Sequence, residues 1–226
     1  MATINFGRAE RQQSRDAQAS SLLGCSMADP WEIVQYDVKA FPFARIVRQM
    51  IGVRDLTCLP KASAVATRES DQQTAYHSKF YQNLEAFLPT YRRLLCHLFD
   101  EGLDRVYFQR VPTFRVHMRG SVAVGAWHRD RDYGHDSSEV NYWLPLTPAS
   151  RSNTIWIEGC PVTAKYGDIV VFDGANLEHG NTINRTTTSR VSFDFRIISK
   201  QTYRPRLDRS VSAGARFLVG EYWDLR

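Results

Sequence analysis

The chain has 226 residues, 43% of them hydrophobic and 23% charged, so it can bury one sizeable core and is too apolar to stay disordered. Its formal net charge of +5 comes from scattered basic residues rather than a block of like charges, which does not favour nucleic acid as a partner. No run of about 18 apolar residues occurs and the first residues are polar, so we expect a cytoplasmic protein with no membrane partner.

We expect a single domain over residues 1–226. Its helical part covers approximately residues 1–104, its strand-rich core approximately 105–200, and a closing segment 201–226. The four cysteines form no CxxC pair, so we expect reduced, mostly buried thiols and no zinc–thiolate site.

The N-terminal part reads as helices and turns. Residues 8–24 are polar and predict either a short exposed helix or a loose segment. Residues 30–59 are irregular and contain Pro42, which indicates short helices and turns. Over residues 74–103 apolar residues recur close to a 3.6 period, so we expect a helical layer in which Pro89 marks a break or a new helix start.

The residue pattern changes after Asp104. Short segments follow that are rich in β-branched and aromatic residues, and several alternate apolar with polar positions, which is typical of strands. Helices followed by a run of short strands predict an α+β fold, a jelly-roll or sandwich core braced by helices on one face. The predicted strands lie within 105–118, 139–147, 153–159, 167–174 and 188–198.

Two histidines and one aspartate form a candidate metal site. If His128 and Asp130 lie on one strand, their side chains point to the same face, because side chains two apart in a strand do so. His179 follows another predicted strand after a short turn, which can bring it beside the first two. Two imidazoles and one carboxylate leave three positions open, the arrangement of non-haem Fe(II) oxygenases. An isolated HxD pair also occurs by chance, so the metal site needs support from elsewhere in the chain.

That support comes from Arg190 and Ser192, which again share one face of a predicted strand. A guanidinium fork beside a hydroxyl suits a carboxylate, and Arg binds carboxylates bidentately where Lys does not. The alternative is that Arg190 is an ordinary surface residue of the strand.

In order and spacing, His128-x-Asp130, His179 and Arg190-x-Ser192 resemble the pattern of the Fe(II)/2-oxoglutarate-dependent oxygenase superfamily. The resemblance implies a double-stranded β-helix core, with Fe(II), 2-oxoglutarate and O2 as cofactor and cosubstrates. It implies that the triad binds iron and that Arg190 and Ser192 bind the distal carboxylate of 2-oxoglutarate. No catalytic residue beyond the metal centre is implied. Because Asp130 is a carboxylate, no ligand position is vacant for chloride, which favours oxygenation over halogenation.

A narrower likeness is to the small oxygenases of aminoglycoside antibiotic clusters, such as that for streptomycin. It rests on the phrases WHRDRDYGH, EVNYWLPLT, LEHGNTIN and RVSFDFRI and covers most of the chain. It implies a small polar substrate, an amino sugar or aminocyclitol, whose C–H bond is hydroxylated or used for oxidative ring closure. The sequence leaves open the oxidised position and the oligomeric state.

Asn141 and Trp143 share one face of a predicted strand whose other face is apolar. If this polar face lines the pocket, the Asn141 amide binds 2-oxoglutarate and Trp143 contacts the substrate. A plain strand-edge asparagine is the alternative.

Other polar residues are candidates for substrate binding. Gln109 and Arg115 stand, with His117, at odd positions of an otherwise apolar strand region, and either enter the same interior or form a solvated outer face. Asp132 and Asp136 lie in a loop after the metal motif, where they could bind substrate ammonium groups.

Two other classes of function remain possible from the sequence alone. A cupin-type metal enzyme without redox chemistry, such as a sugar isomerase or hydrolase, uses the same ligands but has no need of Arg190-x-Ser192. A carbohydrate-binding jelly roll without catalysis leaves the HxD motif incidental.

Overall fold

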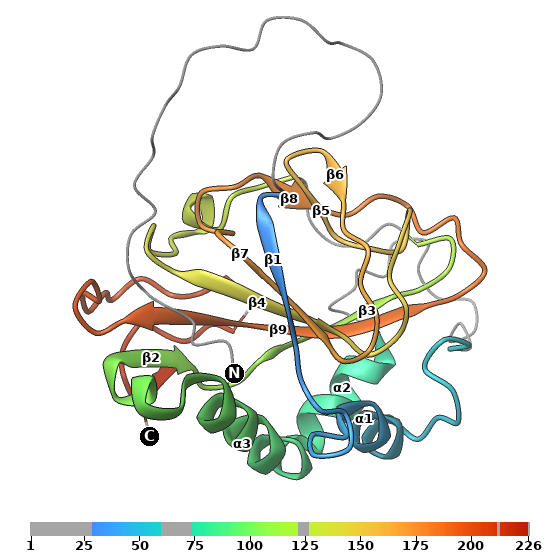
Figure 1. Ribbon diagram of the computed structural model, residues 1–226, viewed down its shortest axis with the longest axis horizontal. Coiled ribbons are helices and arrows are strands. Elements are labelled where there is room, and N and C mark those ends of the chain that lie inside the picture. Colours follow the sequence, from blue (N-terminus) through green and yellow to red (C-terminus); the bar gives the residue numbers. More distant parts are fainter. Residues whose placement is uncertain (1–28, 60–73, 122–126, 212, 226) are drawn as a thin grey trace, which may run out of the picture.

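The computed structural model describes residues 29–59, 74–121, 127–211 and 213–225. A seven-stranded sheet lies across the middle of the molecule, with the helices covering one face and a three-stranded sheet beyond the other (Figure 1). All strand pairs in both sheets are antiparallel. The protein is therefore a mixed helix-and-sheet structure with three layers.

In the large sheet the strand order is β1-β7-β4-β9-β2-β10, with β3 also paired to β9, and in the small sheet it is β6-β5-β8. The elements are β1 (Trp31–Gln35), α1 (Phe43–Ile51), α2 (Ala75–Gln82), η1 (Leu84–Ala86), α3 (Leu88–Phe99), η2 (Asp100–Arg105), β2 (Val106–Gln109), β3 (Thr113–His117), η3 (Asp130–Tyr133), β4 (Val140–Pro145), β5 (Trp156–Ile157), β6 (Cys160–Pro161), β7 (Asp168–Phe172), β8 (His179–Gly180), β9 (Arg190–Ser199) and β10 (Trp223–Asp224).

The helical layer and each predicted strand segment are present. Pro89 stands in the first turn of α3, as expected for a new helix start, because its missing N–H has no partner there in any case. The prediction is wrong for Trp31–Gln35, which forms the edge strand β1 against β7 rather than a helix or turn. Residues 8–24 lie outside the described part of the chain.

The long strand β9 separates two environments. Its odd-numbered residues Val191, Phe193, Phe195 and Ile197 are buried in a core shared with the helices. Phe193 packs at 5.0 Å from both Phe43 and Phe87, measured between ring centroids. The even-numbered residues Arg190, Ser192, Asp194 and Arg196 are polar and lie on the opposite face of the strand. This alternation places a row of charged side chains in the space between the sheets.

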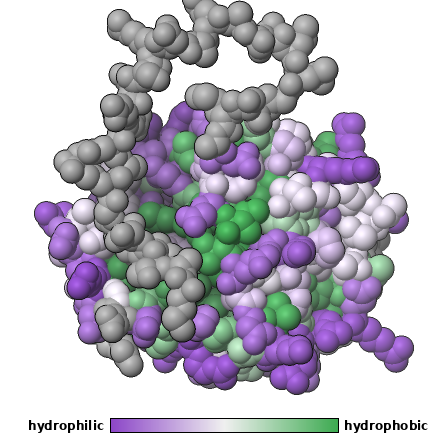
Figure 2. Space-filling model, in the orientation of Figure 1, coloured by the Kyte–Doolittle hydropathy of each residue, from purple (hydrophilic) through white to green (hydrophobic). Residues whose placement is uncertain are grey.

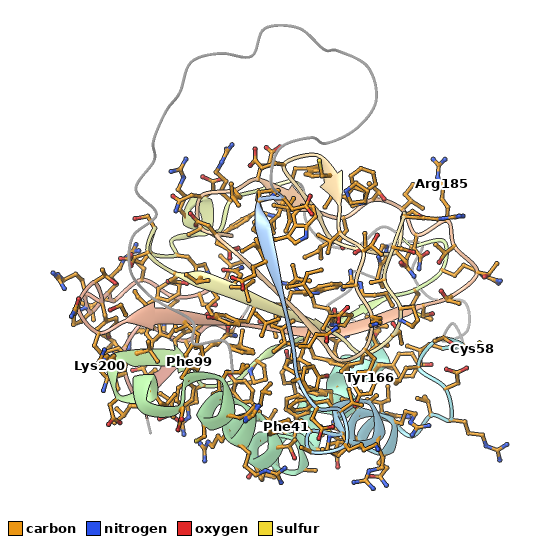
Figure 3. All side chains as sticks on the ribbon, viewed as in Figure 1. Phe41, Cys58, Phe99, Tyr166, Arg185 and Lys200 are labelled. Atoms are coloured by element: carbon orange, nitrogen blue, oxygen red, sulfur yellow. The ribbon has the colours of Figure 1, made fainter. Side chains whose placement is uncertain are left out.

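A second core joins the two sheets, with Trp143, Val170 and Phe172 from the large sheet packed with Ile157 of β5 and with Ile155, which directly precedes that strand. On the helix side, Tyr36 packs edge-on against Phe41 and Tyr166, both labelled in Figure 3. The second core adjoins the polar residues between the sheets, since Trp143 lies 5.7 Å from the Arg190 guanidinium and the Phe172 ring 5.3 Å from that of His179.

Strand β1 forms one edge of the large sheet. Figure 2 shows an apolar area near the centre of the face where Figure 1 places β1, with hydrophilic residues around it. Ile33 is 43% exposed, and Glu32 beside it is also exposed. A charge on an edge strand disfavours pairing with a second sheet.

The cysteines of the described residues are neither buried nor all reduced. Cys58 and Cys96 are free thiols but exposed, and Cys160 is disulfide-bonded, so the prediction of reduced, mostly buried cysteines is wrong in both respects. None of the described helices is long and apolar enough to cross a membrane.

Candidate metal centre and its surroundings

His128 and His179 are brought together by the backbone. The two residues form an isolated antiparallel bridge, with the His128 N–H donating to the His179 carbonyl at 3.0 Å and the reverse bond at 2.9 Å. Their rings lie 4.5 Å apart between centroids. The small sheet, through β8, therefore sets the spacing of the two imidazoles.

Asp130 joins them from a different element than the sequence predicted. It begins the 3-10 helix η3 instead of continuing a strand with His128, so strand alternation is not the reason that the two side chains converge. The Asp130 N–H donates to the Gly174 carbonyl at 2.9 Å, which anchors the start of η3 to the turn after β7.

The three side chains converge on one point. The Asp130 Oδ1 lies 3.5 Å from the His128 Nε2 and 3.6 Å from the His179 Nε2. One ligand atom from each of the three residues lies within 4.8 Å of the other two. The His128 and His179 side chains are 22% and 12% exposed, so the site opens toward solvent on the imidazole side. Two nitrogens and one oxygen in this arrangement suit a divalent transition metal such as Fe(II).

The second carboxylate oxygen of Asp130 is held away from this point. Its Oδ2 accepts hydrogen bonds from the Asn141 Nδ2 at 2.7 Å and from the Arg196 Nε at 2.9 Å, and the Arg196 Nη2 lies 2.8 Å away. A carboxylate whose outer oxygen has three N–H donors presents only its inner oxygen to a metal. Arg196 and Asn141 thus orient Asp130 for one-atom coordination.

The charge states of the ligands also suit a metal. Burial alone would raise the pKa of Asp130, but the Arg196 guanidinium and the His128 hydrogen bond hold it well below its usual value. Burial lowers the pKa of His179, against the opposing effect of the Asp130 carboxylate. The His179 Nδ1 lies 3.0 Å from the Leu177 carbonyl, which selects the tautomer with the proton on Nδ1. The lone pair of Nε2 then faces the site.

Gly174 makes the Asn141 contact possible. A Cβ added at Gly174 would lie 2.5 Å from the Asn141 Nδ2, closer than real Cβ contacts allow. We predict that Gly174→Ala displaces the Asn141 amide from Asp130 and weakens metal binding by about 10- to 100-fold, as the loss of an orienting partner does. Competition of Fe(II) with a chelator measures this effect.

Gly102→Ala is the matched control, because a Cβ at Gly102 meets nothing within 4 Å. Equal metal affinity in Gly174→Ala and the unmodified protein would show that Asn141 does not orient the carboxylate.

A second polar pocket surrounds Arg190, which is fully buried. Its Nη1 donates to the Ser192 Oγ at 2.8 Å and its Nη2 to the Asn181 Oδ1 at 2.7 Å. The guanidinium lies 5.7 Å from the Trp143 ring, whose Nε1 also donates to the Ser192 Oγ, at 3.1 Å. The Ser192 hydroxyl accepts two hydrogen bonds, so its own proton is directed to a third partner.

Several buried atoms near Arg190 lack a protein partner. Among the described residues, six buried side-chain polar atoms have no hydrogen bond, and three of these are the His117 Nδ1, the Thr154 Oγ1 and the Thr182 Oγ1. His117 stands opposite Arg190 in the β3–β9 pair, and the two threonines follow direct partners of Arg190 in the chain. Burial, and then the Arg190 charge, lowers the pKa of His117 to about 3. Buried polar atoms without partners are costly, so this pocket suits a polar anionic ligand.

The residues predicted to bind 2-oxoglutarate lie, with Trp143, on the face of the large sheet that is turned toward the small sheet. Arg190 and Ser192 line the pocket with Trp143, which was predicted as a substrate residue. Asn141, predicted to bind 2-oxoglutarate, donates to Asp130 instead, and its buried Oδ1 has no described partner. A contact between Asn141 and 2-oxoglutarate stays a prediction.

Gln109 and Arg115 also face inward. Gln109 is 2% exposed, and its Oε1 accepts a hydrogen bond from the Arg196 Nη1 at 3.4 Å. The Arg115 Nε donates to the Asp194 Oδ1 at 2.5 Å. The alternative of a solvated outer face is wrong for both residues, because Gln109 bonds Arg196 directly and Arg115 is paired with Asp194, whose Oδ2 lies 3.8 Å from the Arg196 Nη1.

Asp132 and Asp136 make contacts within their own turns. The Asp132 Oδ2 accepts from the Arg129 N–H at 3.1 Å. The Asp136 Oδ1 accepts from the N–H and hydroxyl of Ser138, at 2.9 and 2.6 Å. Substrate contact by either carboxylate stays a prediction.

Sequence reasoning missed two residues of these sites, Arg196 and Asn181. Arg196 could have been found, because it continues the polar alternation of Arg190 and Ser192 on β9. The contact of Asn181 with Arg190 carried no sequence signal, since an asparagine after the distal histidine is equally typical of a turn.

The chain is similar in sequence to one curated protein and in fold to several solved structures. No family model matches the chain. The streptomycin biosynthesis protein StrG of Streptomyces griseus is 54% identical over 191 residues, which cover 84% of this chain and 96% of StrG. The structure of EctD from S. alaskensis with 2-oxoglutarate and 5-hydroxyectoine is similar with a TM-score of 0.54 and 15% identity, over 80% of this chain and 75% of EctD. EctD with bound Fe gives a TM-score of 0.53 and 17% identity, over 80% and 76% of the two chains. At these identities the structural likeness shows the fold.

Proposed function

The chain belongs to the family of the streptomycin biosynthesis protein StrG, and from this premise we propose that it is an Fe(II)/2-oxoglutarate-dependent oxygenase that oxidises a C–H bond of a small polar natural-product intermediate. We take the substrate to be an aminoglycoside or aminocyclitol. The observation that carries the proposal is the convergence of His128, Asp130 and His179 beside a buried arginine pocket.

In this proposal the triad holds Fe(II). The orientation of Asp130 by Arg196 and Asn141 supports coordination through Oδ1 alone, which leaves three positions for 2-oxoglutarate and O2. When bound, Fe(II) supplies the redox chemistry by which dioxygen converts 2-oxoglutarate to succinate and carbon dioxide and oxidises a substrate C–H bond.

Arg190 and Ser192 hold the distal carboxylate of 2-oxoglutarate. The guanidinium is already oriented by Ser192, Asn181 and Trp143, so little freedom is lost when the carboxylate binds. The partnerless buried atoms of His117, Thr154 and Thr182 support a polar ligand in the same place. Together these residues fix the cosubstrate and exclude water from its far end.

Three finer points belong to the same proposal. Two antiparallel sheets that share a core support a double-stranded β-helix. Kinship with StrG supports a role in antibiotic biosynthesis, with hydroxylation or oxidative ring closure as the reaction. A cytoplasmic location suits dependence on Fe(II) and 2-oxoglutarate.

The buried Arg190 pocket disfavours one rival function, and the orientation of Asp130 by Arg196 disfavours the other. A non-redox cupin-type isomerase or hydrolase needs the triad. It gives no reason to bury an arginine beside polar atoms that have no hydrogen-bond partner. A carbohydrate-binding domain without catalysis gives no reason for an aspartate oriented by an arginine fork.

One experiment separates all three. The protein is loaded anaerobically with Fe(II), titrated with 2-oxoglutarate, and monitored for the visible charge-transfer band of the chelated metal; succinate is measured after oxygen is admitted. We expect a saturable band and succinate formation. Metal binding without a band would favour the non-redox enzyme, and no metal binding would favour the carbohydrate-binding domain.

A further inference from the structure

A cavity of about 350 Å³ lies between helix α2, strands β2 and β3, and the chain segment before β10. Its wall includes Tyr81, Gln109, Thr113, Glu221 and Tyr222. Its volume is within the range of small-molecule sites, about 300 to 1,000 Å³. A hollow of about 450 Å³ at the end of α1 is larger, but none of its lining residues belongs to the metal centre or the Arg190 pocket.

Three hydroxyl groups in this wall have protons to donate. The Tyr81 hydroxyl accepts from the Phe114 N–H at 3.1 Å, and the Thr113 Oγ1 accepts from the Gln109 Nε2 at 3.2 Å. The Tyr222 hydroxyl accepts from the Arg196 Nη1 at 3.2 Å. Within the described residues no acceptor is found for the proton of any of the three. Hydroxyl donors grouped in one cavity suit a ligand that offers several oxygen atoms.

Charge in the cavity is already compensated. Glu221 is the one carboxylate among its lining residues, and it is paired with Arg216. The remaining wall includes small apolar residues such as Val111 and Ala213. Apolar surface with neutral hydroxyl donors favours a hydroxyl-rich ring over a group with several ammonium charges.

The cavity is connected to the metal centre through Arg196. Gln109 and Tyr222, both in the cavity wall, bond the Arg196 Nη1, while the Nε of the same guanidinium bonds Asp130. The metal-binding triad does not itself line the cavity. Only the Arg196 side chain would then separate a ligand in this cavity from Asp130. The ligand would lie near the metal centre without touching the three metal ligands.

We propose that this cavity binds a neutral polyhydroxylated ring, a cyclitol or sugar unit, as the part of the substrate remote from the oxidised carbon. The proposal rests on the proposed oxygenase function and names a site for its substrate. Tyr81, Thr113 and Tyr222 donate hydrogen bonds to the hydroxyl oxygens of the ring, and Val111 and Ala213 contact its C–H faces.

The test uses the full chain loaded with Fe(II) and 2-oxoglutarate without oxygen, with myo-inositol as the probe in saturation-transfer NMR. Ala213→Phe fills the cavity and is expected to abolish transfer to myo-inositol. Val211→Phe is the matched control, since Val211 lies on the same segment, is 74% exposed and does not line the cavity. Thr113→Val removes one donor and is expected to weaken binding by about fivefold, the value of one neutral hydrogen bond.

The iron–2-oxoglutarate band is recorded for every variant and is expected to be unchanged. No transfer in the unmodified protein, or equal transfer in Ala213→Phe and Val211→Phe, would overturn the cavity proposal. Transfer that Ala213→Phe abolishes, in a protein that shows no band, would support the ring site and reject the oxygenase function.

Discussion

Asp130→Asn is expected to abolish iron binding while the fold is kept. The outer oxygen of Asp130 has only N–H donors as partners, from Asn141 and Arg196. In the variant the amide oxygen must take that position, because the amide nitrogen would meet three donors there. The NH2 group then faces the two imidazoles, and an amide nitrogen has no lone pair to offer a metal. Loss of a residue that only orients a ligand lowers metal affinity by up to about 100-fold. Because Asp130→Asn removes a ligand itself, we expect a larger fall in Fe(II) affinity.

Metal content after anaerobic loading, measured by elemental analysis, checks this result. Asp132→Asn is the matched control, since it makes the same chemical change two residues away at an exposed carboxylate. Near-normal iron in Asp130→Asn would reject coordination through Oδ1, and iron loss in Asp132→Asn would move the site along the loop.

Arg190→Ala is expected to weaken 2-oxoglutarate binding at least about 30-fold with iron still bound. Removal of one partner from a buried charged pair costs about 2 to 5 kcal/mol, and about 1.4 kcal/mol corresponds to tenfold in affinity. Arg190→Lys keeps the charge but loses the planar fork and its bonds to Ser192 and Asn181, so it should also bind poorly. Ser192→Ala is expected to lose about fivefold, the value of one neutral hydrogen bond.

Anaerobic titration with 2-oxoglutarate, followed by the visible band, measures these affinities. Arg185→Ala is the control, because Arg185 is exposed and points away from the molecule in Figure 3. Thermal melting and iron content separate a binding defect from a folding defect. Unchanged 2-oxoglutarate affinity in a folded, iron-loaded Arg190→Ala would remove the pocket from the proposal.

The helices and the two faces of β9 could be predicted, because each depends on the spacing of residues close together in the sequence. Apolar period and Pro89 located the helices, and the alternation of β9 placed Arg190 and Ser192 on one face. Strand β1 was missed because it pairs with β7, more than 130 residues later, and its five residues show no clear alternation. Long-range pairing of this kind leaves little trace in a short segment.

At the candidate site the three predicted metal ligands do converge, but the sequence did not indicate the way they are brought together. His128 and Asp130 were expected to share a strand, whereas a backbone bridge to His179 holds one and the start of η3 holds the other. The role of Asn141 could not be read from the sequence either, because it depends on the close approach of Gly174 to its amide. Such contacts are set by tertiary packing.

The two-sided arrangement of β9 has a consequence for how the protein tolerates mutation. Substitutions along residues 190–197 should sort by parity: odd positions lower the melting temperature by opening cavities in the core shared with the helices, whereas even positions alter ligand binding and cost stability by leaving a buried partner unpaired. A one-residue deletion in this strand would turn the polar residues toward the helices and the apolar residues toward the pocket, so ligand binding and stability would be lost together. Related chains can therefore diversify their chemistry at every second residue while the helix-facing side stays constrained by folding alone.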